Sequence, residues 1–152
     1  MADYDDQPLI YLLYRAMAAL RPHVAAELEA LGLGLQEFVC LRVLSMSPGQ
    51  SSAELARNTN VSPQSMNPVL RSLQEMGAVT RPAAVSSGRA LPSRLTRRGR
   101  ALLKRAELAL HLTDERLLFE LTPTERRDFK RLLHLMGSQP VSNAIASPRC
   151  RG

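Results

Sequence analysis

Apolar residues recur at steps of three and four along most of this chain, which is the spacing of an amphipathic helix. The first run covers residues 9–31 and predicts one long helix. Pro22 lies inside that run and is expected to kink or interrupt the helix, because proline has no amide hydrogen to donate. Gly32 and Gly34 end the run, and a second helix is expected over residues 36–45.

Hydroxyl side chains in N-cap positions mark the starts of the later helices. Ser51, with Glu54 three residues on, matches a capping box, in which each side chain accepts a hydrogen bond from the other residue's backbone amide. Ser62 precedes Pro63, and proline is favoured at the first helical position. Together with Thr96 and the segment TPTE at 122–125, these signals predict helices over 51–57, 62–76, 96–120 and 122–136.

Two short strands are expected at residues 78–81 and 90–95, separated by a loop of small residues, AAVSSGR at 83–89. This pattern predicts a β-hairpin. Helix, tight turn, helix and hairpin in that order form a winged helix-turn-helix, so the expected fold is mainly α with a small β-hairpin wing. From Gly137 the composition turns to Ser, Pro, Asn and Gly, and residues 138–152 are expected to be a disordered tail.

The helix that follows Ser62 has two distinct faces. One face is apolar and carries Met66, Val69, Leu70, Leu73 and Met76. The other is short, polar and mostly uncharged, and carries Gln64, Ser65, Asn67, Pro68, Arg71, Ser72 and Glu75. Gln and Asn side chains recognise adenine edges, and Arg recognises guanine. The pattern therefore favours a DNA recognition helix over an ordinary solvated helix.

The charge distribution supports a polyanionic partner. The chain has 152 residues with 20 Lys and Arg against 14 Asp and Glu, a formal net charge of +6. Residues 62–105 hold nine of the cations and one anion, which is +8 for the segment and −2 for the rest. A basic region confined to one part of a chain is typical of nucleic-acid binding.

The same inventory argues against several other classes. A chain of this length is too short for most large enzyme folds with a separate substrate domain. Cys40 and Cys150 do not form a disulfide framework, and His23, His111 and His134 are too far apart to suggest a catalytic or metal site. We expect no enzymatic activity, cofactor or metal. With no signal-like start and no apolar run long enough to cross a bilayer, we expect a cytoplasmic protein without a membrane partner.

Several segments, taken in order, resemble the MarR family of bacterial transcription regulators over residues 8–137. They are LGLGLQEF at 31–38, PGQSSAELAR at 48–57, VSPQSMN at 61–67, GRA at 88–90, LT at 95–96 and GR at 99–100. The resemblance implies a homodimer that binds a palindromic operator in duplex DNA, most often as a repressor. Residues 8–34 and 97–137 would form the helical dimerisation region, and residues 35–96 the winged DNA-binding lobe. A small, often aromatic acid bound between these regions would release the DNA.

Two positions depart from the family pattern. Wings of this family usually carry an acidic residue two positions before the tip arginine, which would be Arg89, but Ser87 stands there. The ion pair that would brace Arg89 is therefore absent, and the wing is expected to be more flexible. Pro68 removes an amide hydrogen bond to the carbonyl of Gln64 and is expected to kink the recognition helix or loosen its first turn.

Candidate site residues follow from this interpretation. The expected DNA contacts are Ser62, Pro63, Gln64, Ser65, Asn67, Pro68, Arg71, Arg89 and Arg94, with Arg71 reading a base and the two wing arginines holding the backbone or minor groove. An anionic effector needs a cation beside an apolar crevice, and the candidate cations are Arg15, Arg21 and Arg42. Tyr11 and Tyr14 are the candidate stacking or hydroxyl partners. Two alternatives stay open, a thiol redox sensor of the same fold acting through Cys40 and an RNA-binding winged module.

Overall fold

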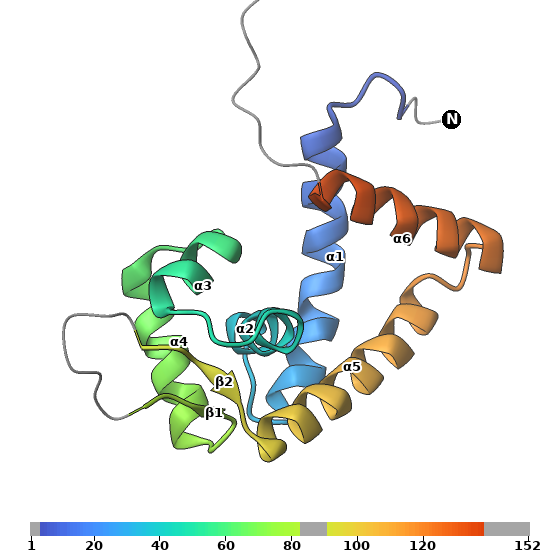
Figure 1. The fold of residues 1–152 in the computed structure, drawn as a ribbon. Coiled ribbons are helices and arrows are strands. Elements are labelled where there is room, and N and C mark those ends of the chain that lie inside the picture. The colour runs from blue at the N-terminus through green and yellow to red at the C-terminus, as the bar shows by residue number, and fades with distance from the viewer. Residues whose placement is uncertain (1–3, 83–90, 139–152) are drawn as a thin grey trace, which may run out of the picture. The chain divides into compact units, whose positions relative to one another are not determined.

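The computed structural model describes residues 4–82 and 91–138. Its elements, in chain order, are α1 (Leu9–Glu29), α2 (Leu35–Met46), α3 (Ser52–Asn58), α4 (Pro63–Glu75), β1 (Val79–Thr80), β2 (Arg94–Leu95), α5 (Arg97–Leu117) and α6 (Pro123–Ser138), as Figure 1 shows. The chain divides into two compact units, Met1–Asp114 and Glu115–Gly152. The expected fold class, mainly α with a small β-hairpin wing, is confirmed.

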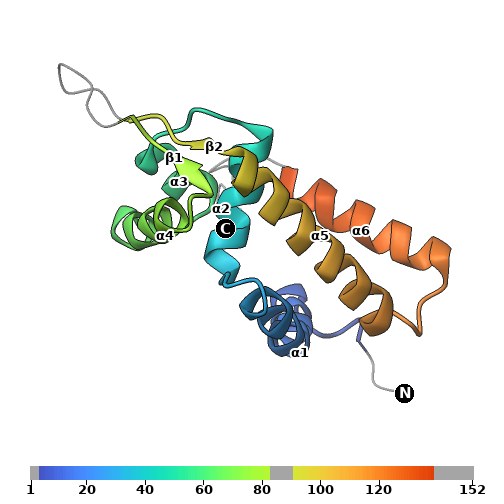
Figure 2. The ribbon, with the colours of Figure 1, turned by 90° about the horizontal axis from the view of Figure 1, so that it is seen from below.

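The first unit is built on an aliphatic core to which α2, α3 and α4 contribute most of the buried side chains. α3 packs against both α2 and α4, and Figure 2 shows α3 and α4 side by side next to the hairpin. Fully buried side chains of this core are Leu28 of α1 and, from the three helices, Cys40, Leu41, Leu44, Leu55, Met66, Leu70 and Leu73. Burying each leucine or methionine side chain is worth about 1.5 to 3 kcal/mol. The core therefore fixes α4 through one face and leaves its other face open.

The wing strands are shorter than the sequence indicates. β1 and β2 pair antiparallel with Val79 opposite Leu95 and Thr80 opposite Arg94, and Ser93 forms an isolated bridge with Gln50. Ala78, Arg81, Leu91 and Pro92 lie outside the strands, and proline has no amide to donate to a ladder. The loop residues 83–90, which include Ser87 and Arg89, lie outside the described residues.

The helix starts follow the capping residues. Ser51 Oγ accepts from the Glu54 amide at 3.2 Å while the Ser51 amide donates to the Glu54 carboxylate at 2.8 Å. Thr122 and Glu125 make the same pair of bonds at the start of α6, at 3.3 and 2.7 Å. Ser62 Oγ accepts from the Ser65 amide at 3.2 Å. The capping signals predicted in the sequence are therefore confirmed.

The sequence predicts that Pro22 kinks or interrupts the first helix, and the interruption does not occur. α1 is continuous from Leu9 to Glu29 with Pro22 inside it. Pro22 removes the hydrogen bond to the carbonyl of Ala18, and both residues are exposed, so water can satisfy that carbonyl.

Within the described residues, no helix combines the length and apolar character needed to cross a membrane.

Candidate functional site

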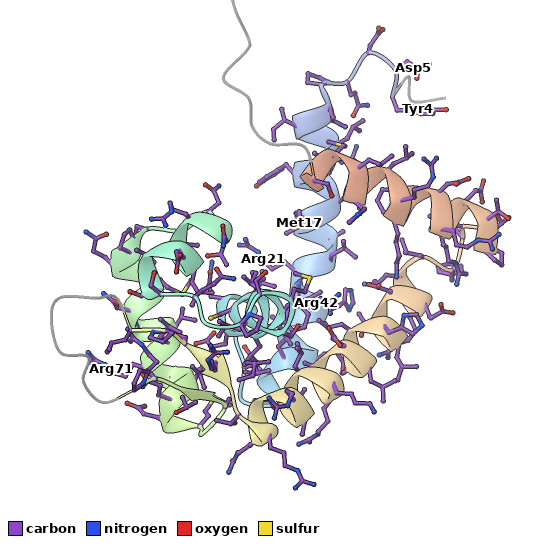
Figure 3. The ribbon with its side chains drawn as sticks, viewed as in Figure 1. Tyr4, Asp5, Met17, Arg21, Arg42 and Arg71 are labelled. Atoms are coloured by element: carbon purple, nitrogen blue, oxygen red, sulfur yellow. The ribbon has the colours of Figure 1, made fainter. Side chains whose placement is uncertain are left out.

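The open face of α4 is the first candidate site. Met66, Val69, Leu70 and Leu73 are buried, as the sequence predicted for the apolar face. Exposed side chains on the opposite side are Gln64, Ser65, Asn67, Pro68 and Arg71. Figure 3 shows Arg71 on the outer side of α4. The fold thus presents amide, hydroxyl and guanidinium groups from one helix to solvent.

Two residues at the start of α4 already have structural roles. Ser62 Oγ caps the helix and lies 2.9 Å from Ser65 Oγ, so these hydroxyls form a local pair. Pro63 occupies the first turn, where its missing amide leaves no bond unmade. Gln64, Asn67 and Arg71 have side chains with no such local bond among the described residues. These three are the groups best placed to meet a ligand.

Pro68 lies inside a continuous helix, because α4 extends from Pro63 to Glu75. The carbonyl of Gln64 therefore lacks its amide donor, as the sequence predicts. Gln64 and Pro68 are both exposed, which leaves that carbonyl accessible to solvent. The proline ring consequently forms part of the open face and does not end the helix.

A network of backbone and amide bonds fixes the base of the wing to the turn before α3. The Ser93 amide donates to the Gln50 carbonyl at 2.7 Å, and the Gly49 amide donates to the Ser93 carbonyl at 2.9 Å. The Gln50 side chain donates to the Ser47 carbonyl at 2.8 Å and accepts from Asn58 Nδ2 at 2.6 Å. The sequence reasoning missed Gln50, since a glutamine in a turn carries no signal of burial.

A second set of bonds joins the end of α4 to the start of α5. Thr96 Oγ1 donates to the Gly77 carbonyl at 2.6 Å and accepts from the Gly99 amide at 3.0 Å. Gly99 lies so close to the Ala78 carbonyl that a Cβ there would overlap it. The glycine is required by this close approach. α5 is thereby tied to the residues that follow α4.

The second candidate site is a cavity of about 660 Å³ within the first unit, between α1, α2 and α5. Its walls are mainly apolar and include Leu20, Val24 and Phe38. Arg21 is the cation in its lining, and Glu29 and Asp114 are the carboxylates. Of the five effector candidates from the sequence, Arg21 alone lines this cavity; Figure 3 shows it on α1 with Met17.

The other four effector candidates lie elsewhere. The Arg15 guanidinium stacks over the Tyr11 ring at 5.9 Å. Arg42 forms an ion pair with Glu107 of α5 at 2.9 Å. Tyr14 borders a separate hollow of about 300 Å³ together with Arg21. The helical pattern of α2 alone could not show the partner of Arg42, because that partner lies on α5. Arg15 and Tyr11, by contrast, lie four residues apart on α1, a spacing that places them on one face.

Cys40 is fully buried among the core residues of α2. Burial, and then the nearby Glu37 carboxylate, raises the pKa of the Cys40 thiol to about 12. The thiolate is the reactive form, so this environment suppresses oxidation and metal binding. Within the described ranges, no three His, Cys, Asp or Glu side chains gather closely enough to hold a metal ion.

The sequence of this chain is similar to one protein family and to one named repressor. Residues 33–91 match the sequence model of the MarR family. The chain is 62% identical over 134 residues to the HTH-type transcriptional repressor Rv2887 of Mycobacterium tuberculosis H37Rv, an alignment that covers 88% of this chain and 96% of the relative.

Two crystal structures of the M. tuberculosis MarR family protein Rv2887 are also similar. The complex with DNA matches with a TM-score of 0.76 and 57% identity, covering 88% of this chain and all of that one. The complex with salicylic acid matches with a TM-score of 0.72 and 60% identity, covering 90% of this chain and 99% of that one.

Proposed function

This chain belongs to the MarR family of transcription regulators, and from that premise we propose that it is a repressor that binds a palindromic operator as a homodimer. Each protomer places α4 in the major groove of duplex DNA, the position of the recognition helix in a winged helix-turn-helix. The observation that carries the proposal is the open polar face of α4 over a fully buried apolar face. The +8 charge of residues 62–105 supplies the matching electrostatic field.

Within that interface, Gln64, Ser65, Asn67 and Arg71 contact base edges, and Arg71 reads a guanine. Ser62 and Pro63 lie close to the backbone at the helix N-terminus, where amide groups favour phosphate. Pro68 contributes an apolar surface that suits a thymine methyl group. Arg89 and Arg94 of the wing hold the backbone or the minor groove.

The dimer rests on apolar side chains that one chain leaves uncovered. α1 exposes five large apolar side chains, α5 two and α6 five; they are Leu9, Ile10, Tyr11, Tyr14, Met17, Leu108, Leu112, Phe129, Leu132, Leu133, Leu135 and Met136. Soluble monomers rarely leave so much apolar surface open. Residues 8–34 and 97–137 accordingly form the dimerisation region, and residues 35–96 form the DNA-binding lobe.

A small aromatic acid acts as the effector in the cavity between α1, α2 and α5. Its ring lies against Leu20, Val24 and Phe38, and its carboxylate meets Arg21. The complex of Rv2887 with salicylic acid supports this class of ligand. In this proposal, the protein acts on DNA in the cytoplasm and performs no catalytic step.

The test is a titration of the protein with an operator duplex and with single-stranded RNA across a salt series. We expect binding to the duplex, with an affinity that falls steeply as salt rises. Arg71→Ala should weaken operator binding by about 1 to 3 kcal/mol and relax the preference at one base pair per half-site. Arg127→Ala, on α6, is the matched control and should leave both unchanged. Tighter binding to the RNA, or loss of affinity in Arg71→Ala that is equal for every duplex sequence, would contradict the proposal.

A further inference from the structure

A second hollow, of about 310 Å³, lies where the C-terminal end of α2 meets β2 and the first turn of α5. We call it the wing-base hollow, and its lining residues are Leu44, Ser45, Pro48, Arg94, Leu95 and Arg100. It shares none of these residues with the larger cavity between α1, α2 and α5. The two sites are therefore lined by entirely different residues.

The two sites also differ in charge. The larger cavity has one arginine, Arg21, against two carboxylates, those of Glu29 and Asp114. The wing-base hollow has two arginines and no carboxylate in its lining. An anion is consequently favoured more strongly in the wing-base hollow.

A backbone carbonyl holds one guanidinium group of the wing-base hollow, and a glycine turn leaves room for the other. Arg100 Nη1 donates to the Leu95 carbonyl at 3.1 Å. The Arg94 guanidinium lies over Gly49, where a Cβ atom would be only 3.2 Å from Arg94 Nη2. Gly49 has a φ of +86°, a conformation that favours glycine, so the turn itself leaves the space that Arg94 fills.

Neither arginine of this hollow forms an ion pair with any residue that the structure describes. A guanidinium has five N–H donors, and a single backbone carbonyl uses one of them in Arg100. The remaining donors suit the fork geometry of a carboxylate. Leu44, Pro48 and Leu95 supply an apolar wall beside them. The hollow thus offers both features that binding of a small organic acid requires, guanidinium donors for the carboxylate and an apolar wall for the rest of the molecule.

We propose that the wing-base hollow is a binding site for a small organic carboxylate, distinct from the effector cavity. The carboxylate bonds to Arg94 and Arg100, and the apolar part of the ligand packs on Leu44, Pro48 and Leu95. One consequence rests on the proposed function: because Arg94 is also a proposed DNA contact, a bound acid competes with DNA for this arginine. Binding of the acid itself does not depend on DNA.

The test is a titration of the full-length, ¹⁵N-labelled protein with salicylate, followed through backbone amide signals in the absence of DNA. Salicylate should shift the signals of Ser45, Leu95 and Arg100 in a saturable way. Salicylamide, which has the same shape without the charge, should leave them in place. The Arg94→Gln, Arg100→Gln double variant should bind at least tenfold more weakly at these signals and respond normally at the signal of Leu110 in the larger cavity.

Arg97→Gln is the matched control, since Arg97 is exposed on the same turn of α5 and does not line the hollow. It should bind salicylate as the unmodified chain does. If the double variant fails to fold, Arg94→Lys and Arg100→Lys keep the charge but lose the fork, and each should weaken binding several-fold.

Absence of a saturable shift at the hollow, or a shift that survives in the glutamine and lysine variants, would overturn the proposal. Inorganic phosphate that binds there as tightly as salicylate would also overturn it, because the apolar wall would then contribute nothing. Since no DNA is present, each of these outcomes is independent of whether the chain is a repressor.

Discussion

α4 and α6 begin in the same way and end in opposite environments. Each starts with a hydroxyl N-cap residue followed by proline, Ser62–Pro63 in α4 and Thr122–Pro123 in α6. Each is amphipathic along its length. Yet α4 buries four of its 13 residues, whereas α6, with 16 residues, buries none.

The difference shows that the residues that start a helix do not determine what the helix packs against. Capping residues set where a helix begins, because they satisfy amides within a few residues of themselves. An apolar face indicates that the helix packs against some partner, but it does not identify that partner. α4 finds its partner in α2 and α3, while the apolar face of α6 is left for a second chain in the proposed dimer.

The largest effect is expected from a charge placed on the apolar face of α6. Leu132 is 51% exposed in the single chain and would be buried at the dimer interface. Leu132→Glu removes about 2 kcal/mol of favourable transfer free energy at this position, and the symmetric dimer contains the position twice. The total loss of about 4 kcal/mol should raise the dimer dissociation constant about a thousandfold. Sedimentation equilibrium measures this constant. Arg127→Glu on the opposite face of α6 should leave it unchanged, and equal effects of the two variants would refute the assigned interface.

The next effect concerns the apolar face of α4, which already has its partners. Leu70 is fully buried, so Leu70→Ala should lower the free energy of unfolding by about 2 to 5 kcal/mol. Asn67→Ala, on the exposed face of the same helix, should change it by less than about 0.5 kcal/mol. Urea denaturation of both variants checks this. A similar loss in both would mean that α4 has no preferred inner face.

A smaller gain in stability is expected from Pro68→Ala. The change restores the amide bond to the Gln64 carbonyl, and an interior proline costs up to about 3 kcal/mol relative to alanine. The melting temperature should rise, and affinity for the operator should fall because the proline surface is lost. Pro22→Ala in α1 is the control, since it restores a backbone bond in the same way and should leave operator affinity unaltered. If Pro68→Ala leaves both quantities unchanged, Pro68 has neither role.

The smallest expected effect is a change in the pKa of one capping carboxylate that leaves the other capping carboxylate unchanged. Hydrogen bonds from the backbone and side chain of Ser51 lower the pKa of Glu54 below its ordinary 4.5, and Thr122 lowers the pKa of Glu125 in the same way. A carboxyl group whose pKa is lower in the folded state stabilises the fold above pH 4.5, and this contribution is lost as pH falls through the lowered value. NMR titration of both carboxylates should show the shifts. Ser51→Ala removes the hydroxyl but keeps the backbone amide, so the pKa of Glu54 should rise only part of the way toward 4.5, and the pKa of Glu125 should stay unchanged. No rise at Glu54 would contradict the contribution of the Ser51 hydroxyl.

Much of the fold could be predicted from the sequence because its signals are local. The caps at Ser51, Ser62 and Thr122 bond to residues three positions away, so they can be read directly. Pro22 does not interrupt α1 as one of the two predicted outcomes had it, since a proline on an exposed side of a long helix costs one hydrogen bond, which water can replace. The predicted strands are too long because the ladder has two residue pairs among the described residues, and Ser93 pairs instead with Gln50, 43 positions earlier in the chain.

The open face of α4 could likewise be predicted, since a helical period fixes which side chains lie opposite the core. The effector residues could not. Arg42 faces Glu107, 65 positions away, and only Arg21 of the five candidates reaches the large cavity. The two arginines of the wing-base hollow lie six positions apart, but its apolar wall also includes Leu44 of α2, which is 50 positions before Arg94, so no single segment predicts the hollow.

The central claim is that two copies of this chain bind one operator through their α4 helices. The most direct measurement is the mass of the complex with a palindromic operator duplex, determined by sedimentation at micromolar concentration. The account predicts two chains per duplex, with the complex lost when Leu132→Glu prevents dimerisation. One chain per duplex, or a Leu132→Glu monomer that binds the full operator as tightly as the unmodified protein, would contradict it.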